Sequence, residues 1–276
     1  MKPNPANVSQ CERLRLASIV PQRARMSGER MGNKAGASVE FLDHRPYVFG
    51  DDLRKIDWKA FARNDQLLIK QFREENRPMA HIVIDGSLSM MFPPSKAQTA
   101  LDIGVMLSQI CAAQGLETRV SNLGGRSWSA KESVSIDFNH RAPLIEELKR
   151  QVGMVPCGAL LFLLSDFFSP HDPRMLMNIL SQRAGMIVLL QVVSQEELEP
   201  TVGGSFLFKD AESDREIVVD LSEETVSMYK TRVDNLRHGL EDEIFRRGGR
   251  YCLINTQTDF QSICGLLVER EILQSQ

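Results

Sequence analysis

From Pro78 onward, short apolar runs alternate with stretches whose apolar residues recur at helical spacing. The run LLFLL at residues 160–164 contains no polar position, which is typical of a strand buried on both faces of a parallel sheet. The predicted strands are residues 80–85, 117–123, 133–138, 160–166, 186–193 and 250–255, with a hairpin in 205–221. The predicted helices are residues 95–115, 143–152, 172–184, 222–247 and a closing helix from residue 260. This alternation predicts an α/β fold with a central, mostly parallel sheet flanked by helices.

The N-terminal part of the chain has a different pattern. Residues 1–35 are polar and basic, and we expect a flexible arm with a short helix near residues 12–18. In residues 36–78, apolar and polar positions alternate around Val39 and again from Leu67 to Phe72, which predicts a β arm. A charged connector, RPYVFGDDLRKIDWKAFARND, separates its strands. The α/β domain is expected to occupy residues 79–276.

Composition narrows the class of protein. The chain has 276 residues, of which 42% are hydrophobic and 25% charged, so it can bury a normal core. Its net charge of −3 gives no reason to expect a nucleic-acid partner. The longest apolar run is far shorter than the ~20 residues of a membrane span. The five cysteines are scattered, which indicates neither a disulfide framework nor a zinc site. We therefore expect a cytoplasmic protein with reduced thiols and no transmembrane segment.

Polar side chains follow two of the predicted strands. Asp85, Ser87 and Ser89 come directly after the first strand, and Asp166 comes directly after the run at 160–164. Ligands of open α/β sheets bind at the carboxyl ends of strands. Carboxylate and hydroxyl oxygens suit Mg²⁺ or Mn²⁺, so these four residues are candidate metal ligands. Asp and Ser after a strand also form turns and helix caps, which is the alternative explanation.

The sequence contains no motif typical of a catalytic centre. Neither the phosphate-binding pattern GxxxxGK[ST] nor the dinucleotide pattern GxGxxG occurs. The nucleophile motif GxSxG is also missing. We therefore assign no catalytic residue and expect a protein that is not an enzyme.

Two segments resemble known families. DGSLSM at residues 85–90, followed by LLSD at 163–166, resembles the metal-ion-dependent adhesion site of von Willebrand factor type A (vWA) domains. The pattern RxYxxGDDxRxIDW at residues 45–58 resembles the family called domain of unknown function 58 (DUF58). Proteins of that family are vWA-like and are often encoded beside MoxR-type AAA+ ATPases. The resemblance extends from about Gly36 to the C-terminus.

The resemblance implies a vWA-like, Rossmann-type fold with an adhesion-type site at Asp85, Ser87, Ser89 and Asp166. vWA domains also supply a Thr ligand from an intervening loop. The corresponding loop here, FNHRAPL at 138–144, contains neither Thr nor Ser, and Asn139 is a candidate substitute for the missing oxygen ligand. Two hypotheses stay open: a divalent ion, Mg²⁺ or Mn²⁺, or a vestigial site whose acids are held by backbone groups or a basic side chain.

The charged connector also has two interpretations. Asp51, Asp52, Arg54 and Asp57 are candidate partner-binding residues. Alternatively, these residues and Arg63 pair with one another and hold the β arm against the vWA-like core, while Tyr47 and Trp58 pack beneath them.

The resemblance leads to one principal hypothesis on function. We expect a non-enzymatic adaptor that partners a MoxR-type AAA+ ATPase and a client protein during maturation or remodelling of a complex. One alternative is a metal-dependent phosphohydrolase, with His140 or Arg141 as the groups near the ion. The other is a structural subunit whose metal site is vestigial.

Overall fold

The computed structural model describes residues 1–17, 39–74, 79–169, 171–210 and 215–275. The chain divides into two units, residues 1–21 with 78–276 and residues 22–77. Each unit is described by itself. Within the described residues, none of the helices has the length and apolarity that a membrane span requires.

The larger unit is built on a six-stranded sheet with the order β11-β8-β7-β4-β5-β6. Every neighbouring pair in it is parallel except β5 and β6, which are antiparallel. The strands are β4 (Met79–Ile84), β5 (Glu117–Asn122), β6 (Ser127–Ser129), β7 (Leu160–Ser165), β8 (Met186–Val193) and β11 (Arg250–Asn255). The prediction of an α/β fold with a central, mostly parallel sheet is confirmed.

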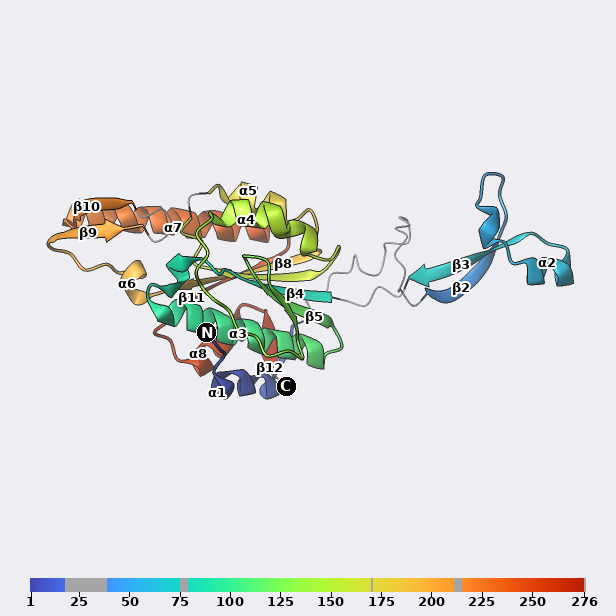
Figure 1. Cartoon of the computed structure of the whole chain (residues 1–276), viewed down its shortest axis with the longest axis horizontal. Coiled ribbons are helices and arrows are strands. Elements are labelled where there is room, and N and C mark those ends of the chain that lie inside the picture. The colour runs from blue at the N-terminus through green and yellow to red at the C-terminus, as the bar shows by residue number, and fades with distance from the viewer. Residues whose placement is uncertain (18–38, 75–78, 170, 211–214, 276) are drawn as a thin grey trace. The chain divides into compact units, whose positions relative to one another are not determined.

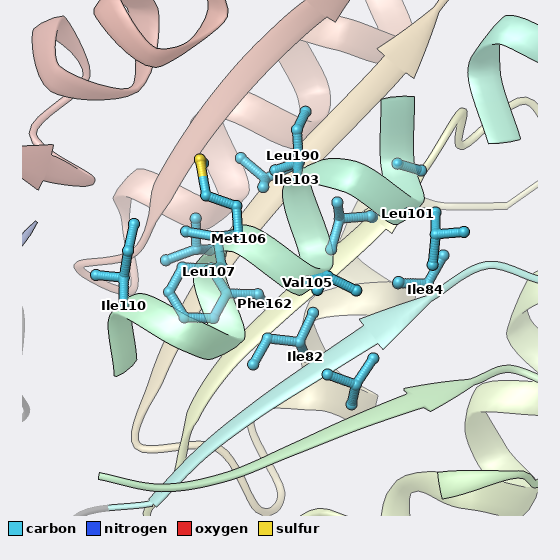
Figure 2. Close-up of a cluster of buried hydrophobic side chains, with 14 of the residues drawn as sticks. Ile82, Ile84, Leu101, Ile103, Val105, Met106, Leu107, Ile110, Phe162 and Leu190 are labelled. Carbon is cyan, nitrogen blue, oxygen red and sulfur yellow. The ribbon is translucent and has the colours of Figure 1, made fainter. Parts of the chain in front are cut away.

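Helices cover both faces of this sheet because alternate strand residues point to opposite sides. One face packs against α3 (Pro94–Ala113) and α8 (Phe260–Glu269). Figure 2 shows Ile82, Phe162 and Leu190 of the sheet among the apolar side chains of α3. The other face packs against α4 (Leu144–Gln151), α5 (Pro173–Leu180) and α7 (Glu223–Phe245) (Figure 1). The apolar run of β7 is therefore buried on both faces.

Short elements connect or extend this framework. A hairpin of β9 (Ser205–Lys209) and β10 (Glu216–Asp220) precedes α7, and its strands are exposed along most of their length. The short helices are η4 (Leu88–Met91) after β4, η5 (Val152–Met154) after α4, and α6 (Gln195–Leu198) after β8.

The first residues of the chain differ from the sequence-based expectation of a flexible arm. They form α1 (Pro5–Val8), η1 (Ser9–Arg13) and β1 (Leu14–Leu16), and β1 pairs with β12 (Leu273–Ser275). Leu14 and Leu16 are buried, and the Asn7 amide donates to Asp102 of α3 at 2.7 Å. Residues 1–17 are therefore part of the packed larger unit, and residues 12–17 do not form the expected helix. The rest of the predicted arm, 18–35, lies outside the described residues.

The strand predicted at residues 133–138 is not formed. Val134, Ile136 and Phe138 are nevertheless buried in the core on the α3 side. The segment pairs with no strand of the sheet, and the backbone of Ile136 instead exchanges hydrogen bonds with Met1 at 3.2 and 2.7 Å. The antiparallel neighbour of β5 is β6 instead.

The smaller unit contains the predicted β arm. Strands β2 (Val39–Pro46) and β3 (Leu68–Glu74) pair in an antiparallel hairpin. The charged connector between them forms η3 (Leu53–Lys55) and α2 (Trp58–Asn64), a helix that the sequence analysis did not predict. Ile56 in the connector and Ile69 in β3 are both buried, and their backbones form an isolated antiparallel β-bridge.

The space around two helical glycines, Gly104 of α3 and Gly265 of α8, predicts opposite effects of alanine substitution on stability. A Cβ on Gly104 would lie 2.6 Å from Ile84 Cδ1, whereas a Cβ on Gly265 of α8 would meet no atom within 4 Å. We expect Gly104→Ala to lower the free energy of unfolding by about 1–3 kcal/mol because it overpacks the core. Gly265→Ala should raise it by about 0.5–1 kcal/mol because alanine reduces backbone freedom in the unfolded chain.

Urea unfolding followed by circular dichroism measures both changes. Equal stability of the two variants would contradict the close packing of α3 on β4.

Candidate functional site

The ends of β4 and β7 bring the two predicted strand-terminal acids to one edge of the sheet. The strands are parallel neighbours, and the Asp85 backbone N–H donates to the Leu164 carbonyl at 2.8 Å. The Ser165 hydroxyl donates to Asp85 Oδ2 at 2.6 Å, and Asp166 is the next residue. Asp85, Ser165 and Asp166 are all buried. The topology therefore places both acids at the carboxyl edge of the sheet, as the ends of adjacent parallel strands require.

The loop after β4 gathers the remaining predicted ligands. Asp85 Oδ1 accepts the Ser87 backbone N–H at 2.9 Å, and the Ser87 and Ser89 hydroxyls are 3.0 Å apart. Gly86 between them lies against β5, since a Cβ there would come within 2.9 Å of the Leu123 carbonyl oxygen. The close backbone approach explains why a residue without a side chain stands at this position. Asp85, Ser87 and Ser89 thus form one contiguous group of oxygens.

A lysine that the sequence analysis missed completes this edge. Lys96 lies in the first turn of α3, and only 1% of its surface is exposed. Its Nζ is 2.9 Å from Asp166 Oδ2 and 2.6 Å from Glu197 Oε1 of α6. A basic residue in a first helical turn is unfavourable to the helix dipole, which was the available signal that this lysine has acidic partners elsewhere.

Burial and neighbouring charges shift the protonation of this group. Burial raises the pKa of Asp85, and the nearby charge of Asp166 raises it further. For Lys96, burial works to lower the pKa, but the attraction of Asp166 and Glu197 outweighs it and the net shift is upward. Lys96 is therefore an ammonium at neutral pH, and it compensates carboxylates in a region that water scarcely reaches.

The four predicted metal ligands thus lie at the same edge of the sheet. The two carboxylates among them are not free, because each already has partners in the protein. Asp166 contacts the Lys96 ammonium through Oδ2 and accepts the Phe168 backbone N–H through Oδ1 at 3.1 Å. In the part of the chain that the structure describes, no three His, Cys, Asp or Glu side chains are grouped so as to hold a metal ion. The metal site stays a prediction, and what the structure places next to Asp166 is a lysine.

The loop at residues 138–144 lies beside the same edge. The His140 backbone N–H donates to the Gly86 carbonyl at 3.0 Å, and its carbonyl accepts the Leu88 N–H at 2.8 Å. The His140 ring extends toward α4, where its Nε2 is 3.1 Å from Glu147 Oε1. Asn139 lines an open polar pocket at the end of β5 with Asn122 and Asp137. The backbone of His140 therefore supports the loop, while its ring contacts a different acid.

In the smaller unit, each of the predicted partner-binding acids has a local partner. Asp51 pairs with Arg45 at 2.6 Å and Asp52 with Arg54 at 3.0 Å, while Asp57 lies 2.9 Å from His44 and 3.6 Å from Lys70. Asp57 also caps α2 by accepting the N–H groups of Lys59 and Ala60. Only Asp52 and Arg54 pair as the second interpretation expects, because Asp51 and Asp57 pair with residues of β2.

Of the two aromatic side chains in that interpretation, Tyr47 is half-buried and Trp58 is exposed. Trp58 does not pack beneath the charged pairs, because 59% of its surface is exposed. Phe49, at the tip of the connector, is 99% exposed, and Leu53 is exposed as well. A hairpin with one short helix has too little interior to bury them. A role of Asp51, Asp52, Arg54 and Asp57 in binding a partner stays a prediction.

The cap of α2 predicts how the smaller unit responds to acid. The hydrogen bond from His44, together with backbone donors and Lys70, lowers the pKa of Asp57 to about 2. A carboxylate whose pKa is depressed on folding stabilises the fold above its unfolded pKa of about 4, and this contribution is lost as the pH falls toward 2. We expect Asp57→Asn to reduce the loss of α2 structure between about pH 4 and pH 2.

Fluorescence of Trp58, in a Trp128→Phe background, follows this transition. Asp65→Asn at the other end of α2 is the matched control and should titrate like the parent. An unchanged profile in Asp57→Asn would show that this carboxylate does not hold the helix.

Comparisons with known proteins bear on part of this picture. Residues 43–124 match the family model described as protein of unknown function DUF58, and the matched segment includes residues 45–58, which resemble that family. No curated protein matches the chain. A solved structure described as an aerotolerance-related membrane protein from Bacteroides fragilis NCTC 9343, with multiple mutations to serines, is 12% identical with a TM-score of 0.39. That comparison covers 70% of this chain and 98% of the other.

Proposed function

We propose that this protein is a non-catalytic, vWA-like interaction module that works with a MoxR-type AAA+ ATPase in the maturation or remodelling of a protein complex. The match to DUF58 supports the family association on which the choice of partner depends. The observation that carries the proposal is the carboxyl edge of the sheet, where a buried polar network is followed in the chain by an exposed aromatic side chain.

The chemistry of this edge favours binding over catalysis. Lys96, Asp166 and Asp85 are buried, and each already has partners inside the protein. A general acid or base has to come within hydrogen-bond distance of a substrate, which enclosed groups cannot do without rearrangement. Their pairing instead rigidifies the loop that follows β4. The edge therefore has the properties of a fixed surface.

An exposed anchor lies on that surface. Phe92 follows η4 directly, its backbone N–H donates to the Ser89 carbonyl at 3.1 Å, and 63% of its surface is exposed. Aromatic side chains on a rigid support are among the groups that contribute most to protein–protein binding. We place the ATPase contact at Phe92 and the neighbouring loop.

The proposal predicts a local effect on binding. We expect Phe92→Ala to weaken the complex with the MoxR-type ATPase of the same organism by about 10-fold or more in Kd, because truncation of an aromatic anchor costs ~2 kcal/mol. Met154→Ala is the matched control, since Met154 is 54% exposed and precedes β7 at the opposite edge of the sheet. Isothermal titration calorimetry measures both.

Two outcomes would contradict this assignment. Wild-type affinity of Phe92→Ala would move the contact elsewhere, and no binding by the wild type would remove the proposed partner. Hydrolysis of a phosphomonoester with Mg²⁺ or Mn²⁺, abolished by Asp166→Ala, would instead favour the phosphohydrolase alternative.

A further inference from the structure

Lys96 is an unusual residue for its position. It is among the largest fully buried side chains, and the neighbouring residues of α3 on the same side belong to the apolar core. Burying an ammonium in such surroundings is costly unless acids pair with it closely. Its ammonium contacts two carboxylates, and they come from segments 70 and 101 residues away in the sequence. The lysine therefore joins α3, the end of β7 and α6.

Glu197, the second partner, is itself held in place. Its Oε2 accepts the Ser194 backbone N–H at 2.8 Å, and its own N–H donates to Ser194 Oγ at 3.3 Å, which closes a capping box on α6. Its carbonyl accepts the Tyr229 hydroxyl of α7 at 2.9 Å. With Oε2 engaged in the cap, Oε1 is directed to Lys96. The glutamate is a preorganised anion.

Two carboxylates contact this ammonium, and a third acid, Asp85, lies at the same edge of the sheet. Asp166 and Glu197 contact Lys96 directly, and Asp85 is close enough to Asp166 for their charges to interact. A divalent ion in an adhesion-type site would supply positive charge to the same acids. Asp166 cannot offer Oδ2 to such an ion while it pairs with the ammonium.

We infer that Lys96 is the resident cation of this edge and does the electrostatic work that a divalent metal would do in an adhesion-type site. The wild-type protein therefore keeps its strand-end loop in place without Mg²⁺ or Mn²⁺. This inference concerns the surface on which the proposed function rests, but its test needs no ATPase, so either one can fail without the other.

The test exchanges the lysine for a metal. Wild-type protein, freed of metal with EDTA and titrated with MnCl₂, should show no change in Tm and no calorimetric binding. Lys96→Ala removes the ammonium and opens space beside Asp166 and Glu197. We expect the variant to have a lower Tm than the wild type and Mn²⁺ to raise that Tm by about 5 °C, reversibly with EDTA.

Two further variants test whether the response to Mn²⁺ depends on the missing positive charge and on the carboxylates. Lys96→Arg keeps a cation, so its Tm should not change with Mn²⁺, as in the wild type. Lys96→Ala combined with Asp166→Asn removes a carboxylate and should lose the response to Mn²⁺. Should Lys96→Ala yield no folded protein with or without Mn²⁺, the same titration of Lys96→Gln, which keeps a donor but no charge, decides.

Two results would overturn the inference. One is a wild-type protein that Mn²⁺ or Mg²⁺ stabilises, since its edge would then take a metal despite the lysine. The other is a folded, uncharged Lys96 variant that shows no response to Mn²⁺, because the three acids would then need no cation.

Discussion

The ion pairs of Lys96 with Asp166 and Glu197 are the constraint on which the carboxyl edge of the sheet depends. Desolvating an ammonium and two carboxylates costs several kcal/mol per ion, and only close contacts offset that cost. The contacts of 2.9 and 2.6 Å meet this requirement. Loss of one partner would leave an uncompensated charge in the interior. These ion pairs therefore hold α3, the end of β7 and α6 together.

The loop after β4 lies beside these ion pairs at the same edge of the sheet. Asp85 is bonded to Ser165 at the end of β7 and to the backbone of its own loop, so the loop after β4 is tied to the neighbouring strand. The exposed Phe92 lies at the end of that loop. A rigid support lowers the entropic cost of presenting an aromatic anchor to a partner. Buried charge and exposed surface thus serve one proposed contact.

The smaller unit shows the opposite distribution. The pairs Arg45–Asp51 and Asp52–Arg54 join residues close in the sequence, at or near the surface, and such pairs contribute little to stability. The exposed side chains of this unit include the apolar Phe49, Leu53 and Trp58. A partner of this segment would therefore meet exposed apolar side chains as well as charges. The sequence analysis considered only the charged residues as partner-binding candidates.

The sequence by itself determined the features that depend on local pattern. The alternation of apolar runs and helical spacing predicted the parallel sheet and its helices, and the strand-end rule predicted that Asp85 and Asp166 share an edge. Tertiary structure decided whether extended segments pair: residues 133–138 form no strand although their apolar side chains are buried, whereas β1 pairs with β12. It also decided the counter-ion, because no local pattern joins Lys96 to acids 70 and 101 residues away. Charge compensation in a core depends on distance in space, and only the folded chain sets that distance.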